Sequence, residues 1–79
     1  MDLRLERLSA EMEYATVTAW RVAEGDAVTA GQAVAEVEAD KVVEEIASPV
    51  DGIVAEIVAA VGDELPVGSL LAVIREGAP

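Results

Sequence analysis

The stretch that decides the fold runs from Glu38 to Gly52 and reads EADKVVEEIASPVDG. Apolar and acidic residues alternate from Ala35 to Asp40, which is the pattern of a half-buried strand. Beyond Lys41, Val42, Ile46 and Ser48 fall on one face and Val43, Glu45 and Ala47 on the other, which predicts a second strand. Pro49, followed by Asp51-Gly52, marks another turn. The two residues between the predicted strands, Asp40 and Lys41, are therefore predicted to form the tip of a β-hairpin.

The sequence on either side of this hairpin is duplicated. A shift of 37 positions aligns Gly25-Asp26 with Gly62-Asp63, and Gly31 with Gly68, without a gap. Six apolar positions of the first half follow the same shift: Val17, Trp20, Val22, Val28, Val34 and Val37 match Val54, Ile57, Ala59, Leu65, Leu71 and Ile74. Glycines and apolar residues in one ungapped register indicate an internal repeat.

The repeat favours strands over helices. Glycine and β-branched residues recur too often for stable helices, and each half is expected to hold four short strands with a bulge or bend at the same place. The segment Leu3 to Met12 has a helix-forming composition, but a strand at this end is favoured because the repeat needs a partner strand there. The predicted fold class is all-β, a flattened β-barrel or sandwich of two four-stranded antiparallel sheets related by a pseudo-two-fold axis.

The core of this sandwich is expected to come from the repeated apolar positions. The residues predicted to be mostly buried are Val17, Trp20, Val22, Val28, Val37, Val54, Ile57, Leu65, Leu71 and Ile74. At 79 residues the chain is long enough for one small domain, predicted over residues 1–76, with residues 77–79 as a tail or the start of a linker.

Composition disfavours several classes of function. The formal net charge of −11 repels phosphate backbones and anionic lipid, so no nucleic-acid or membrane partner is expected. The absence of Cys and His removes disulfides, thiolate zinc sites and the commonest general base. A cytoplasmic location is the default expectation, or the mitochondrial matrix if the source is eukaryotic, and the domain itself is expected to be monomeric.

Lys41 is the only lysine of the chain. One explanation is compositional, because the chain prefers Arg and Ala and few lysines are expected. Its position supports another, since an ammonium on a flexible stem at a tight turn is accessible to a modifying enzyme. A lysine at this position is better placed to be acylated by another enzyme than to act by itself.

Four linked motifs resemble the lipoyl domains of the biotinyl/lipoyl carrier family. Glu38 to Val42 (EADKV) and Ser48 to Gly52 (SPVDG) are similar to the family's Glu-Thr-Asp-Lys-Ala and Ser-Pro-x-x-Gly at the same separation. Trp20 to Val28 (WRVAEGDAV) resembles Trp-x-Val-x-x-Gly-Asp-x-Val, and Val61 to Leu65 (VGDEL) echoes it in the second half.

The resemblance covers Leu3 to Glu76 and carries a function with it. It implies that Lys41 bears lipoate in amide linkage, as a swinging arm that carries acyl groups and reducing equivalents within a 2-oxo acid dehydrogenase complex. It also implies that Asp40 shapes the turn and takes part in recognition, although Asp is an ordinary turn residue as well. Such a domain is a carrier without a catalytic site of its own, and it occurs in the family as a part of dihydrolipoamide acyltransferase chains or as an independent carrier.

The partners implied by the resemblance are enzymes that load and unload the arm. They are a lipoate ligase or lipoyl transferase, a thiamine-dependent 2-oxo acid decarboxylase, an acyltransferase core and a dihydrolipoyl dehydrogenase. Three residues depart from the family pattern, namely Ala39 for Thr, Glu44 for an aliphatic residue and Glu6 for a frequent Pro. Glu44 indicates either that its face is exposed near the turn or that it weakens the hairpin.

Three other functions compete with this one. Biotin carboxyl carriers share the fold and the modified lysine, but they usually place Met on both sides of it, where this chain has Asp40 and Val42. An unmodified barrel-sandwich interaction module would extend the hairpin tip, which the tight turn opposes. An autonomous enzyme could use paired carboxylates such as Asp51 and Asp63, but these are more simply turn residues or solubilising charges.

Overall fold

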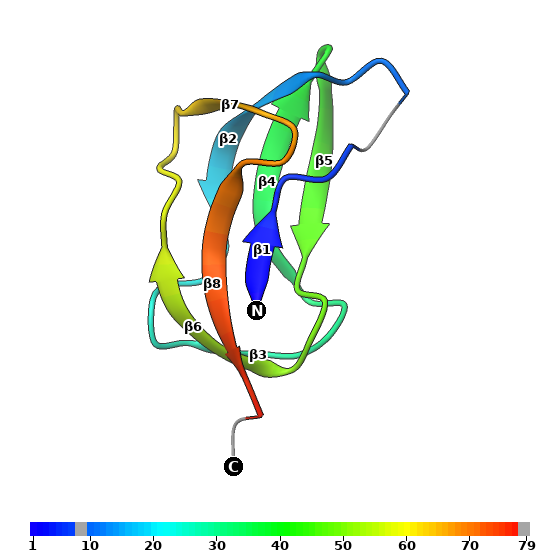
Figure 1. Ribbon diagram of the computed structural model, residues 1–79. Coiled ribbons are helices and arrows are strands. Elements are labelled where there is room, and N and C mark those ends of the chain that lie inside the picture. The colour runs from blue at the N-terminus through cyan, green and yellow to red at the C-terminus, as the bar shows by residue number, and fades with distance from the viewer. Residues whose placement is uncertain (8–9, 78–79) are drawn as a thin grey trace.

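The computed structural model describes residues 1–7 and 10–77, and these residues form eight strands and no helix. The strands are β1 (Asp2–Arg4), β2 (Tyr14–Trp20), β3 (Ala27–Val28), β4 (Ala33–Ala39), β5 (Val42–Ala47), β6 (Gly52–Ile57), β7 (Glu64–Pro66) and β8 (Leu70–Glu76). All pairings are antiparallel, and they give two four-stranded sheets with the orders β1-β8-β6-β3 and β5-β4-β2-β7 (Figure 1). The predicted fold class is confirmed as a sandwich, whose sheets do not close into a barrel.

The predicted pseudo-two-fold repeat is present in the strand order. Exchange of β1 with β5, β2 with β6, β3 with β7 and β4 with β8 converts one sheet into the other. The irregularities repeat as well, since the ladder shifts register between Val17 and Ala19 in β2 and between Val54 and Glu56 in β6. A bulge at the same place in each half, 37 positions apart, is what the sequence predicts.

Backbone hydrogen bonds join each half to the other in equivalent pairs. The donors and acceptors are Gly25 N–H to Val54 O (2.7 Å), Gly62 N–H to Val17 O (2.8 Å), Val54 N–H to Asp26 O (2.9 Å) and Val17 N–H to Asp63 O (2.9 Å). Gly25 and Gly62 have φ of 93° and 97°, a region that L side chains rarely enter. The duplicated Gly-Asp pairs are therefore turns that also tie the two halves together.

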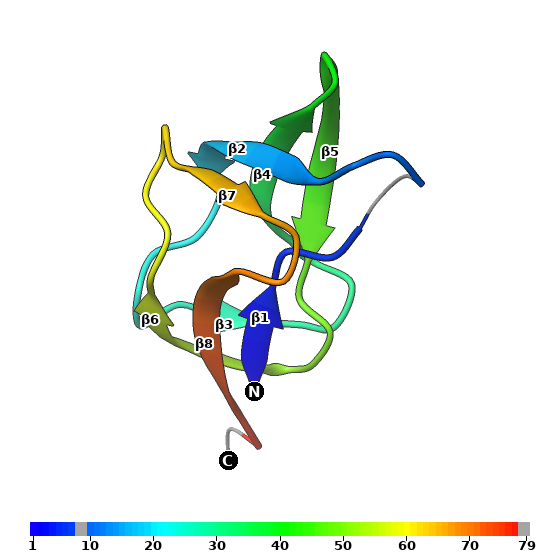
Figure 2. The same ribbon diagram turned by 45° about the horizontal axis from the view of Figure 1, so that its top comes forward.

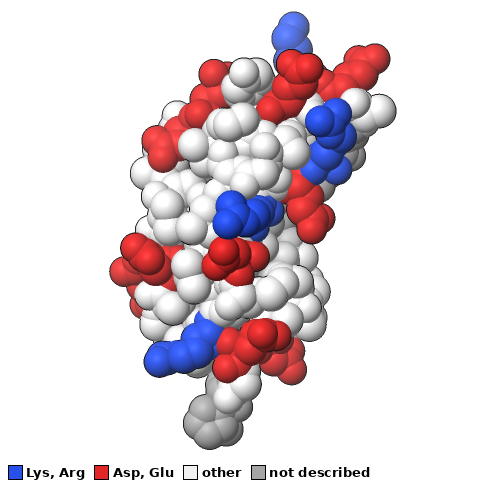
Figure 3. All heavy atoms as spheres, in the orientation of Figure 1, with Lys and Arg blue, Asp and Glu red and all other residues white. Residues whose placement is uncertain are grey.

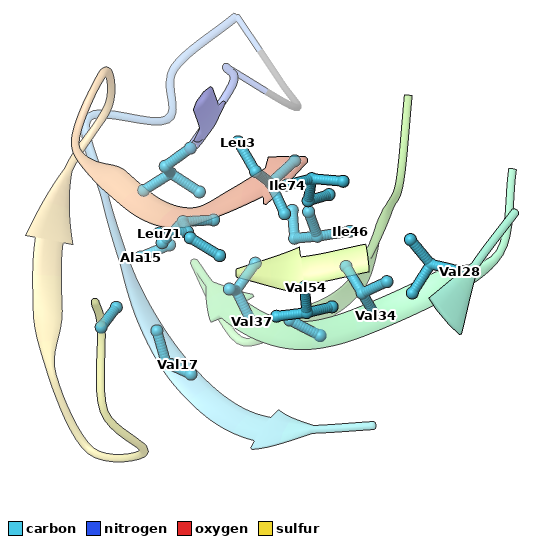
Figure 4. Packing of buried hydrophobic residues seen from close by; sticks show 14 of the residues in the cluster. Leu3, Ala15, Val17, Val28, Val34, Val37, Ile46, Val54, Leu71 and Ile74 are labelled. Carbon is cyan, nitrogen blue, oxygen red and sulfur yellow. The ribbon is translucent and has the colours of Figure 1, made fainter. Parts of the chain in front are cut away.

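The core lies between the two sheets (Figure 4). Six of the ten predicted core residues are buried: Val17, Val28, Val37, Val54, Leu71 and Ile74. The other four, Trp20, Val22, Ile57 and Leu65, are only partly buried and pack against the margin of the core. At this margin the indole Nε1 of Trp20 donates a hydrogen bond to the carbonyl of Ala59 at 2.8 Å, which satisfies its one polar group.

The first segment supplies core residues that the prediction omitted. β1 pairs with β8 and buries Leu3, so the preference for a strand at this end is confirmed. Leu5 and Met12 are each only 1% exposed, although they lie outside the regular strands. Residues 8 and 9 of this segment lie outside the described part of the chain, as do residues 78 and 79 of the predicted tail.

Gly52 has a role that the turn prediction did not anticipate. It is the buried first residue of β6, where a Cβ atom would overlap the backbone carbonyl oxygen of Arg75 on β8. The last residue of the Ser-Pro-x-x-Gly motif is therefore glycine because two strands approach each other closely there.

Truncation of a central core residue should destabilise the domain strongly. Leu71 is fully buried, so Leu71→Ala should lower the free energy of unfolding by about 2–5 kcal/mol. Val61 is 60% exposed, and Val61→Ala should change the free energy of unfolding by less than about 0.5 kcal/mol. Urea denaturation followed by circular dichroism measures both, and equal costs would contradict the assigned core.

Addition of one methyl group at Gly52 should also be costly. In Gly52→Ala the added Cβ atom meets the backbone carbonyl of Arg75, which cannot rotate away as a side chain could, so β6 is forced away from β8. The expected loss is about 1–3 kcal/mol of unfolding free energy. Ala55 is an exposed residue of the same strand, so Ala55→Val serves as a control that should cost less than about 0.5 kcal/mol. Thermal unfolding of the two variants compares the costs, and a neutral Gly52→Ala would refute the close approach.

Candidate functional site: the β4–β5 hairpin

The tip of the β4–β5 hairpin is a two-residue turn. Ala39 pairs with Val42, which leaves Asp40 and Lys41 as the two loop residues. Their φ angles are 51° and 64°, and positive φ at both central positions is the signature of a type I′ turn. The predicted position of the hairpin tip is therefore confirmed.

Lys41 occupies this turn at an energetic cost. Type I′ turns prefer Asn-Gly or Asp-Gly, because a side chain with a Cβ atom is strained at positive φ. Asp tolerates this region through local hydrogen bonding, whereas Lys has no such compensation. The turn holds a residue that its backbone conformation disfavours, and such strain is found most often at functional sites.

The hairpin projects beyond the rest of the sandwich (Figure 2), and Lys41 lies at its tip. Lys41 is exposed, and its ammonium has no hydrogen bond or ion pair with any residue in 1–7 or 10–77. Val42 and Val43 are 53% and 51% exposed, because the core ends below them. Glu44 is exposed too, so the first explanation of this departure holds and its face is open near the turn.

The base of the hairpin is held firmly. β4 pairs with β5 on one side and with β2 on the other, and its residues Ala35 and Val37 are each 1% exposed. Across the outer face, Arg21 forms an ion pair with Glu36 at 2.8 Å, and the Thr18 hydroxyl donates to the same carboxylate at 3.0 Å. A rigid stem thus supports an exposed tip.

The carboxylates of the proposed enzymatic pair serve the backbone. Asp51 Oδ1 accepts a hydrogen bond from the N–H of Ala30 at 2.7 Å, and Asp63 Oδ2 accepts one from Ala60 at 2.9 Å. Within the described ranges, no group of three or more Asp or Glu residues is arranged to hold a metal ion. These contacts support the interpretation as turn residues.

Acidic residues gather around the hairpin from segments that the sequence prediction did not connect. They line an open depression beside the tip, together with the exposed ring of Tyr14: Glu11, Glu13, Glu38, Asp40 and Glu64. On the face shown in Figure 3, basic side chains stand apart from one another among acidic ones. The only sequence signal for this gathering is the overall charge, because the residues come from three separate stretches of chain.

An antiparallel sandwich with an exposed lysine on a two-residue turn at the tip of a hairpin fits a carrier domain as the class of protein. The sequence profile of the Biotin_lipoyl family, described as biotin-requiring enzyme, matches residues 2–74. The chain therefore belongs to this family.

Relatives narrow the class further. The chain is 39% identical over 77 residues to the dihydrolipoyllysine-residue acetyltransferase component of the pyruvate dehydrogenase complex of Zymomonas mobilis. It is 34% identical over 76 residues to the corresponding succinyltransferase component of the 2-oxoglutarate dehydrogenase complex of Staphylococcus saprophyticus. Each alignment covers 96% of this chain but only 18% of the relative.

A solved structure agrees with these relatives. The solution structure of the lipoyl domain of the 2-oxoglutarate dehydrogenase complex from Azotobacter vinelandii matches with a TM-score of 0.80 and 33% identity, over 99% of each chain. The chain is thus a lipoyl carrier domain, and it corresponds to the small carrier portion of the acyltransferase components rather than to a catalytic domain. None of the described residues forms a helix long and apolar enough to cross a membrane.

Replacement of Lys41 by glycine should stabilise the fold. Relief of positive-φ strain is worth about 1–2 kcal/mol, and the greater unfolded-state entropy of glycine offsets about half of it, so Lys41→Gly should gain about 0.5–1 kcal/mol. Lys41→Ala removes the amine but keeps the strain, and its stability should stay near that of the original chain. Chemical denaturation tests the difference, and equal stability of the Gly and Ala variants would show an unstrained turn.

Proposed function

We propose that Lys41 is the attachment point of lipoate and that the domain carries acyl groups and reducing equivalents between active sites of a 2-oxo acid dehydrogenase complex. The observation that carries this proposal is that the only lysine of the chain is exposed and unpaired among the described residues, at the tip of a two-residue turn. The relatives support it, since their names specify a dihydrolipoyllysine residue.

The residues at the tip fit such a group. Lys41 is exposed, its amine forms no ion pair with a described residue, and the hairpin that bears it projects beyond the rest of the sandwich. Attachment requires the neutral amine to attack the carbonyl carbon of an activated lipoate, which forms the C–N bond, expels the activating group and releases a proton to solvent. The bound group supplies a dithiolane that accepts an acyl group and two electrons, which no side chain of a chain without Cys can do.

The protein's own contribution is placement. The ladder beneath the turn fixes where the attachment point lies, while the flexible lysine stem lets the far end of the arm move between active sites. The net charge of −11 steers the domain toward basic surfaces and raises encounter rates more than it raises lasting affinity. Brief visits to several enzymes are what a carrier requires.

The proposed partners follow from this chemistry. A lipoate ligase or lipoyl transferase would load Lys41, a thiamine-dependent 2-oxo acid decarboxylase would reductively acylate the arm, an acyltransferase core would take the acyl group, and a dihydrolipoyl dehydrogenase would reoxidise the thiols. Asp40, as the other half of the turn, would take part in recognition by these enzymes. The particular 2-oxo acid would be chosen by the decarboxylase that accepts this domain.

Intact-mass spectrometry tests the attachment directly. Incubation with lipoate, ATP and a purified lipoate ligase should add one lipoyl group, and peptide mapping should place it on Lys41. Lys41→Arg should fold with nearly unchanged stability and take up none, because a guanidinium does not form the amide. A parallel reaction with biotin and a biotin ligase should leave the mass unchanged. Biotin uptake in preference to lipoate, or unfolding of Lys41→Arg, would overturn the proposal.

A further inference from the structure

Strand β5 begins at the residue after Lys41 and has one free edge. It is the outer strand of its sheet and pairs only with β4. The pair that closes a two-residue turn is hydrogen-bonded, so Val42, Glu44 and Ile46 exchange backbone hydrogen bonds with β4. The N–H and C=O groups of Val43 and Glu45 therefore point away from the sheet, and no other described residue bonds to them.

The side chains of this strand leave the edge open. Val42 and Val43 point to opposite faces, and both are more than half exposed, at 53% and 51%. An exposed edge with β-branched residues is a ready template for another strand. Glu44 and Glu45 follow, both exposed, and neither forms an ion pair with the residues that the structure describes.

A hollow continues the edge toward the other sheet. It opens between the end of β5 and the edge strand β1, and its apolar lining comes from Leu3, Ile46, Ala47 and Pro49. Recognition by strand addition combines backbone hydrogen bonds along an edge with pockets for alternate side chains. The β5 edge and this hollow together provide both parts.

Charge decides which occupant fits. One possible occupant is a second copy of this chain, paired antiparallel with its own β5 centred on Glu44. Glu44 would then face Glu44 of the other copy, and Glu45 would face Val43, between two molecules that each carry a net charge of −11. That pairing is repulsive. An extended segment with Lys or Arg residues would instead bring cations to Glu44 and Glu45 and cover Val42 and Val43 with apolar atoms of its side chains.

We propose that the enzyme that loads Lys41 docks an extended, basic segment along β5 as a fifth strand of this sheet, with one apolar side chain in the adjoining hollow. The inference rests on the proposed function of Lys41 and specifies how the loading enzyme holds the domain. Pairing along β5 would immobilise the strand that leads directly out of the turn, and the backbone of Lys41 would then be held in a fixed position relative to the loading enzyme.

Amide hydrogen exchange tests the mode of docking. The domain is mixed with a purified lipoate ligase without ATP, so that the complex forms but no loading occurs. In the free domain the amides of Val43 and Glu45 should exchange quickly, while those of Val42, Glu44 and Ile46 are already protected by β4. Protection of Val43 and Glu45 in the complex supports strand addition. Unchanged exchange at both amides under saturating ligase would overturn it.

Variants test the same mode through the loading rate. Val43→Pro removes one outward N–H and leaves the β4 ladder intact, and Glu44→Lys with Glu45→Lys reverses the charge. The control is Glu56→Lys with Glu76→Lys, which makes the same change in net charge on the other sheet. Each β5 variant should lose on the order of tenfold in kcat/KM for lipoylation, and the control less than about twofold.

The outcomes separate this inference from the proposed function. If the unaltered domain takes up no lipoate, the function of Lys41 fails. If it is loaded and both β5 variants are loaded as fast as the control, only the docking mode fails. Circular dichroism establishes that each variant is folded, and the charge-reversal pair alone decides the question if Val43→Pro unfolds. Analytical ultracentrifugation tests for dimers of the domain. Dimers that are lost in the β5 variants would show that a second copy, rather than a basic segment, occupies the edge, and would also overturn the proposal.

Discussion

The structure depends on a reciprocal exchange of backbone hydrogen bonds between its halves. Val54 accepts from Gly25 and donates to Asp26, while Val17 accepts from Gly62 and donates to Asp63. Each valine therefore sits in the turn of the opposite half, so neither half completes its hydrogen bonding alone. This exchange of hydrogen bonds requires positive φ at both glycines, and it fixes β2 and β6 on either side of the core. The hairpin strand β4 pairs directly with β2.

The two-fold arrangement of strands was predictable from the sequence because the exchange of hydrogen bonds requires the same residues in both halves. Glycine at positive φ, the aspartate beside it and the apolar positions of the inner faces all recur at a spacing of 37. The core residues in and after the first strand were not predicted, for a physical reason. Leu5 and Ser48 hold equivalent hydrogen-bonded positions 43 residues apart, because the connection after β1 is longer than its counterpart, and one fixed shift does not align them. Leu5 and Met12 were missed in the core for the same reason.

The site was predictable to the extent that it is local. A turn between two predicted strands depends on neighbouring residues, so the sequence placed Asp40 and Lys41 at the tip. The partial burial of Trp20 and the depression lined by Glu11, Glu13 and Glu64 depend instead on which strands become neighbours, and no local pattern specifies that. Gly52 shows both cases, since its turn signal was local while the approach of Arg75 was not.

The pseudo-two-fold axis also explains why a single tip can hold an amine. The position equivalent to the β4–β5 turn is where β8 ends and β1 starts, and there the two strands are neighbours, with the Met1 ammonium donating to the Ile74 carbonyl at 2.8 Å. Figure 1 places these strand ends at the opposite end of the sandwich from the hairpin tip. Of these two equivalent positions, one is a two-residue turn and the other is a place where β1 and β8 lie side by side. The turn projects from the sandwich with Lys41 exposed, and it is there that the fold tolerates a lysine in a conformation better suited to glycine.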